Sequence, residues 1–179
     1  MKKLILALCL LVGISFTSKA QFYSVSGNAL ALGTGTLHLE SSMTLDRTWS
    51  LHGGVSFNPW KINSFRIQHL MLRPEVRYWF RESYRGMYVG GNAVYAIYHI
   101  GVPKFMEKKY EGFAFGGGVD LGYAWPIAPK WNIEVGIGTS LLYSQYYWGK
   151  CKECSMRSEE NSKVLFVPTK LGVSVVYLF

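Results

Sequence analysis

Hydrophobic and polar residues alternate with a period of two along most of the chain. Between Trp131 and Tyr143, every second residue is hydrophobic or Thr, and Asn, Glu, Gly and Ser occupy all but one of the positions between them. The segment from Phe113 to Trp125 largely repeats this alternation, with Gly, Ala and Asp at the intervening positions. A helix would require apolar residues spaced three and four apart, which both segments lack. The pattern therefore predicts β-strands with one apolar face.

The same period predicts eight strands, at residues 24–33, 36–46, 49–58, 66–80, 87–98, 112–126, 131–147 and 164–179. Strands in globular proteins average about five or six residues. A tilted strand that spans a bilayer needs roughly 9–11 residues. Most of the expected strands reach this greater length, which favours a membrane barrel.

The expected connections alternate between short turns and longer loops. The short turns lie at 46–48, 81–86 and 127–130. The later links on the opposite side lengthen along the chain, from 58–65 to 99–111 and 148–163. Short periplasmic turns, longer outer loops and an even strand count are typical of bacterial outer-membrane barrels. We therefore predict an all-β fold, an eight-stranded antiparallel transmembrane up-and-down β-barrel, although the first outer link is short for this plan.

Aromatic residues lie near the ends of the apolar strand faces, such as Trp49 and Phe57 in one strand and Trp131 and Tyr143 in another. This placement matches the aromatic girdles of a barrel's lipid-facing surface. A water-soluble barrel would instead turn its apolar face inward, but the opposite faces here contain too much Gly and Ser for an exposed surface. The alternative is a soluble secreted β-barrel that binds a hydrophobic ligand.

The first twenty residues have the features of a secretory signal peptide. Lys2 and Lys3 precede an apolar run that ends at Phe16, and a small-x-small site ends at Ala20. The run is too short for a spanning helix, which needs roughly 20 residues. We expect a signal peptide at 1–20 and one outer-membrane β-barrel domain at 21–179.

The charge balance argues against a nucleic-acid partner. Loss of Lys2, Lys3 and Lys19 with the signal peptide lowers the formal net charge from +8 by three to +5. The remaining charges cluster in predicted loops and turns rather than in one basic stripe. We expect no nucleic acid among the partners.

Charged residues of the strands fall on the faces opposite the aromatic ones. They are Glu40, Arg73, Glu75, Arg77, Asp120, Glu134 and Lys170. An eight-stranded barrel is only wide enough for its own side chains. Because an unpaired buried charge is costly, we expect these residues to form a paired polar network in the barrel interior. The alternative is a proton or small-ion path through rearranged pairs of Arg73, Glu75 and Arg77.

Catalysis is not expected from this sequence. A small barrel that modifies lipids needs a nucleophile with a base beside it. The closest pairing is His38 with Glu40, which we interpret as a hydrogen-bonded interior pair, and no Ser lies near His99 in the sequence. We predict no catalytic residue, no metal site and no cofactor; an outer-leaflet lipid-modifying enzyme is the alternative.

The last strand alternates up to the final residue. Its apolar face carries Leu171, Val173, Val175, Tyr177 and Phe179. An alternating strand with a terminal aromatic resembles the signal that the barrel-assembly machinery recognises in outer-membrane barrels. We expect Tyr177 and Phe179 to belong to such an assembly signal.

Several motifs, taken in order, resemble those of a known family. They are the strand at Asn28 followed by LHLE (37–40), NPW (58–60), RPEVRYWF (73–80) and VPTKLGVSVVYLF (167–179). The family comprises small outer-membrane β-barrel proteins of the Bacteroidota, catalogued as a domain of unknown function and OmpA/OmpX-like in strand number. The resemblance implies an eight-stranded barrel located in the cell outer membrane, and it implies no activity.

The two longest expected loops, 99–111 and 148–163, are where a specific function would lie. The first combines Lys104, Lys108 and Lys109 with apolar neighbours, a mixture suited to lipopolysaccharide or an extracellular protein. The alternative is a solvated loop whose charge maintains solubility. We expect a structural or surface-interaction role through these loops, in contact with outer-membrane lipid.

Cys151 and Cys154, in the second of these loops, are the cysteines expected in the mature chain. In an oxidising compartment a close pair more often forms a disulfide than stays reduced. Bound metal and free thiols are the alternatives, since two Cys without nearby His make an incomplete zinc site. Mass spectrometry without reduction should find the peptide lighter by the hydrogens lost on oxidation; alkylation of both thiols would contradict a disulfide.

Overall fold

The computed structural model describes residues 22–62, 65–101, 109–149 and 161–179. The predicted signal peptide therefore lies outside the described residues. The elements are β1 (Tyr23–Asn28), α2 (Ala29–Gly33), β2 (Leu37–Asp46), β3 (Trp49–Asn58), β4 (Lys61–Ile62), β5 (Phe65–Trp79), β6 (Gly86–Gly101), β7 (Lys109–Ala128), β8 (Trp131–Gly149) and β9 (Asn161–Leu178). Within the described ranges, no helix is long and apolar enough to cross a membrane.

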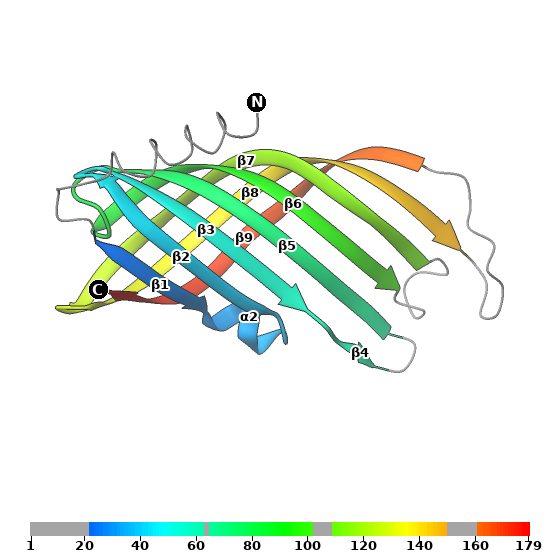
Figure 1. Ribbon diagram of the computed structural model, residues 1–179, viewed down its shortest axis with the longest axis horizontal. Coiled ribbons are helices and arrows are strands. Elements are labelled where there is room, and N and C mark those ends of the chain that lie inside the picture. Colours follow the sequence, from blue (N-terminus) through cyan, green and yellow to red (C-terminus); the bar gives the residue numbers. More distant parts are fainter. Residues whose placement is uncertain (1–21, 63–64, 102–108, 150–160) are drawn as a thin grey trace, which may run out of the picture.

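The strands form one antiparallel sheet that closes on itself (Figure 1). Apart from the two-residue β4, each strand pairs with the strands before and after it, and β3 pairs directly with β5. The ring closes where β1 pairs with β9, with Val25 opposite Tyr177. At this seam the Tyr23 and Phe179 backbones exchange two hydrogen bonds of 3.2 and 3.0 Å. The prediction of an all-β fold with eight antiparallel strands is confirmed.

The first strand is shorter than predicted, because residues 29–33 form the helix α2. The Asn28 side chain causes the change: its Oδ1 accepts hydrogen bonds from the Leu30 and Ala31 N–H groups at 3.0 and 3.2 Å. Asn is among the best N-cap residues, and Ala and Leu favour helix over strand. After α2 the chain turns at Gly35, whose φ of +77° is easily reached by glycine.

The later strands are longer than predicted, and the two long links are correspondingly shorter. β6 continues to Gly101 and β7 starts at Lys109, so both ends of the expected 99–111 loop belong to strands. The ring is therefore uneven in height. β1 has 6 residues and β3 has 10, whereas β7 has 20, and Figure 1 shows the later strands extending well beyond the first three.

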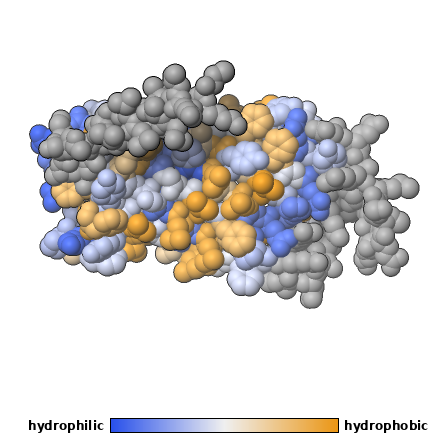
Figure 2. All heavy atoms as spheres, in the orientation of Figure 1, coloured by the Kyte–Doolittle hydropathy of each residue, from blue (hydrophilic) through white to orange (hydrophobic). Residues whose placement is uncertain are grey.

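Polar side chains fill the inside of the ring and apolar ones cover its outside. Among the described residues, 18 polar or charged residues are buried against 8 hydrophobic ones, and 35 large hydrophobic residues are exposed. Figure 2 shows apolar side chains gathered across the middle of the visible face, with hydrophilic residues toward its ends. This distribution is the reverse of that in a water-soluble domain, where charged residues are rarely buried.

Candidate functional site

Arg77, on β5, is the centre of the buried site, with its side chain fully enclosed at 0% exposure. Its Nε donates a hydrogen bond to Glu75 Oε1 at 2.6 Å, and its Nη1 donates to Glu134 Oε2 at 3.0 Å. Its Nη2 donates to Glu40 Oε1 at 2.5 Å. The guanidinium thus joins carboxylates from β5, β8 and β2, and each of these bonds is charge-assisted.

Two further cations extend the network. Arg73 Nη1 lies 3.1 Å from Asp120 Oδ1, and its Nη2 lies 3.0 Å from Glu75 Oε2. Lys170 Nζ lies 3.3 Å from Glu75 and 3.5 Å from Glu134. The structure therefore brings all seven residues of the predicted interior network together. The network contains four carboxylates and three cations, so its charges do not cancel. The ion pairs between them are what stabilise the group.

Neutral side chains that the sequence did not single out complete the network. Tyr88 donates a hydrogen bond from its hydroxyl to Glu134 Oε1 at 2.6 Å, and the Arg77 guanidinium lies 4.6 Å from the centre of its ring. The Tyr88 ring needs space provided by glycine: a Cβ on Gly122 would lie 2.3 Å from the hydroxyl, and one on Gly136 would lie 2.8 Å from it. In the sequence, the two glycines at 122 and 136 were the sign of this space for Tyr88. That they lie opposite each other on β7 and β8 could not be known without the strand register.

His52, Ser50 and Glu40 have the connectivity of a catalytic triad. His52 Nδ1 lies 2.9 Å from Glu40 Oε1, and His52 Nε2 lies 2.8 Å from Ser50 Oγ. Because a carboxylate accepts hydrogen bonds, Nδ1 donates and Nε2 accepts from the Ser50 hydroxyl. However, Ser50 is 0% exposed and its Oγ already accepts a hydrogen bond from Trp79 Nε1 at 2.7 Å. The trio is therefore an internal hydrogen-bond chain with no room for a substrate at its hydroxyl.

The predicted pairing of His38 with Glu40 is wrong. His38 Nδ1 instead lies 2.7 Å from Ser56 Oγ, while Glu40 bonds to His52. The reason is register, since β2 and β3 pair with His38 directly opposite Ser56. Spacing along one strand did not reveal this partner on the next strand.

Apolar layers cover the network at both ends. On the turn side, Trp79 and Tyr84 pack together with ring centres 5.7 Å apart, and burial raises the pKa of the Tyr84 hydroxyl. On the loop side, Val94, Ala114 and Leu142 form a second buried cluster. The network therefore lies between an aromatic and an aliphatic layer.

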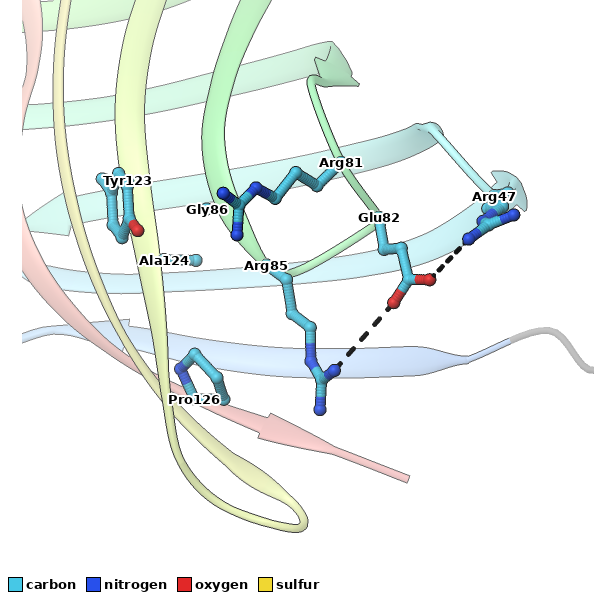
Figure 3. A pocket seen from close by; sticks show the side chains of 8 residues that line it. All are labelled: Arg47, Arg81, Glu82, Arg85, Gly86, Tyr123, Ala124 and Pro126. Atoms are coloured by element: carbon cyan, nitrogen blue, oxygen red, sulfur yellow. Dashed lines mark hydrogen bonds and ion pairs between the residues drawn. The ribbon is translucent and has the colours of Figure 1, made fainter.

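A second site, the basic cleft, lies on the exposed turn side of the ring (Figure 3). Its volume is about 580 Å³, and it contains Arg47, Arg81, Glu82 and Arg85. Glu82 lies 2.9 Å from Arg47 and 4.0 Å from Arg85, whereas Figure 3 shows Arg81 extending toward Gly86. The cleft contains three arginines and one glutamate, so it suits an anionic group.

The other predicted sites are only partly visible. Tyr177 and Phe179 stack at the seam with ring centres 6.2 Å apart, and Tyr177 also packs on Trp131 at 4.9 Å. Cys151 and Cys154 lie outside the described residues. In the part of the chain that the structure describes, no group of His, Cys, Asp and Glu could hold a metal ion.

The structure defines an all-β protein, in which a closed antiparallel ring has a charged interior and an apolar exterior. The chain belongs to the family described as protein of unknown function (DUF3575), which matches residues 5–179. That description names neither an activity nor a bacterial group. No curated protein matches the chain.

Replacing Arg77 should show whether the network stabilises the ring. Arg77→Ala leaves three carboxylates without their shared cation, so the free energy of unfolding should fall by about 3–5 kcal/mol. Urea unfolding, followed by tryptophan fluorescence, measures this change.

Arg81→Ala is the matched control, because this arginine lies in an exposed turn and should change stability by no more than about 0.5 kcal/mol. Neither variant should create or abolish conductance in planar bilayers. A clear change in single-channel current for Arg77→Ala would favour the ion-path alternative instead.

Proposed function

We propose that this protein is a transmembrane β-barrel of a bacterial outer membrane, with a structural and surface-interaction role. The observation that carries the proposal is the inverted distribution of polarity, with ion pairs inside and large hydrophobic residues outside. Exposed apolar surface of this extent is unfavourable in water and favourable in lipid. Because the ring closes, its strands pair with neighbours on both sides over most of their length, which satisfies backbone hydrogen bonds as a bilayer requires.

Aromatic pairs on the outer face support this location. At the turn side, Tyr123 and Trp125 lie with ring centres 4.5 Å apart. At the loop side, Phe115 packs on Tyr143 at 5.6 Å. Two aromatic belts separated by aliphatic residues are the pattern expected at the interfaces of a membrane barrel.

The basic cleft fits the same orientation. Tyr123 and Pro126 border it, so its arginines lie beside the aromatic belt where lipid head groups begin. Cations at this depth attract anionic head groups. We assign the turn side to the periplasm and the loop side to the cell exterior.

The filled interior favours a structural role over transport. Arg77 and Glu75 are fully enclosed, and apolar clusters lie on both sides of them. We therefore assign no transport path through the centre of the ring. The links within 99–111 and 148–163 are the segments we propose to contact lipopolysaccharide or an extracellular partner.

Fractionation combined with gel migration tests the proposal. Protein from isolated outer membranes should migrate differently before and after boiling, because a closed barrel resists detergent until it is heated. A soluble periplasmic protein carried through the same fractionation is the control. Recovery in the soluble fraction, with no heat-dependent shift, would contradict the proposal and favour a soluble barrel that binds a hydrophobic ligand.

A further inference from the structure

The wall of the ring is incomplete between β1 and β9. β1 ends at Asn28, opposite Ser174, while β9 extends toward the loop side well beyond this point. Along 164–173, the edge of β9 that faces β1 has no strand partner among the described residues. The helix α2 lies beside the start of this edge, where Asn28 Nδ2 donates to the Leu171 carbonyl at 3.2 Å.

Such an edge has a functional implication if the wall lies in lipid. At membrane depth, irregular backbone and free strand edges are tolerated only where they line a cavity or are covered by protein. A cavity does lie directly behind this edge. Residues of α2 and β9 line this cavity, so the opening in the sheet between α2 and β9 leads to the interior of the ring.

The cavity behind the opening is small, with a volume of about 260 Å³, and we call it the polar cavity because charged side chains form part of its lining. Its charged lining residues are Arg73, Lys170 and Glu40, and both cations also pair with Glu75 of the network behind them. Arg73 is 2% exposed, and in the described part of the chain its Nε has no hydrogen-bond partner. His38 also lines the cavity and bonds to Ser56 through Nδ1 alone. The Arg73 Nε–H is thus the donor left for an acceptor on a bound head group.

A second cavity lies on the outer face and is almost entirely apolar. Its volume is about 370 Å³, and Leu121, Val135 and Ile137 are among its lining residues. The two cavities share Leu30, on α2, and Leu171, on β9. A polar cavity inside and an apolar groove outside therefore meet at the same opening.

We propose that this opening binds a single-chain amphiphile, a long-chain carboxylic acid. Its carboxylate occupies the polar cavity beside Arg73 and Lys170, and its hydrocarbon chain passes Leu30 and Leu171 into the apolar groove. The polar cavity is smaller than the roughly 300–1,000 Å³ of ordinary ligand pockets, which suits a head group of a few atoms rather than a sugar. The groove, with a volume of about 370 Å³, suits one chain.

Entry of the acid from the bilayer through this opening rests on the proposed membrane location. The binding site itself rests only on the two cavities. Binding is therefore measured on the purified full chain in detergent, by native mass spectrometry during titration with hexadecanoic acid. The methyl ester of the same acid tests the head group, because it has the same chain without the negative charge. A result on binding is thus independent of the fractionation experiment.

Two leucines of α2 provide a matched pair of variants. Leu30→Glu places a negative charge at the junction of both cavities. Leu32→Glu places the same charge on the same helix, at a residue that is 62% exposed and lines neither cavity. Because both variants keep the charged interior intact, neither should prevent folding.

We expect one acid molecule to bind per protein, about tenfold or more tightly than the ester. Leu30→Glu should weaken this binding by about tenfold, and Leu32→Glu should leave it unchanged. Equal binding of acid and ester would overturn the proposal, because it would indicate adsorption of the chain to the apolar wall. Equal affinities for the two variants would overturn it as well.

Discussion

The pairing of Arg77 with carboxylates from three strands is the interaction on which the rest of the structure depends. Glu40, Glu75 and Glu134 come from β2, β5 and β8, which meet around one guanidinium only when the sheet is closed. An isolated buried charge is strongly unfavourable, whereas a fully paired one is tolerated. The network therefore favours the closed ring over an open sheet, and it fixes which face of each strand points inward.

The apolar exterior follows from the inward orientation of the charged residues. Successive residues of a strand point to opposite faces, so turning Glu134 inward turns its neighbours Ile133 and Val135 outward. A ring organised around ion pairs thus presents hydrophobic residues on its outside, where lipid is the favourable surrounding. We propose that specific recognition takes place at three places: the outer links, the basic cleft and the opening beside α2.

Features with a period of two could be predicted from the sequence, and features that depend on strand register could not. Alternation alone identified eight strands and the inward charges from Glu40 to Lys170. It could not assign His38 to Ser56, or place Tyr88 over two glycines, because both require knowing which residues lie opposite on the neighbouring strand. The start of α2 was missed for a different reason. The side chain of Asn28 caps the helix, and this local hydrogen bond ends a strand that the hydrophobic pattern would have continued.

The most direct test of the arrangement, with polar residues inside and apolar residues outside, is to measure what surrounds the outward residues in a bilayer. Spin labels would be attached at Ile137, Leu141 and, as a control in a turn, Glu82, in a chain with Cys151→Ser and Cys154→Ser. If the outer face lies in lipid, labels at 137 and 141 will collide more with oxygen than with a water-soluble nickel chelate, and the label at 82 will show the reverse. Preferential collision with the nickel chelate at all three positions would contradict the account.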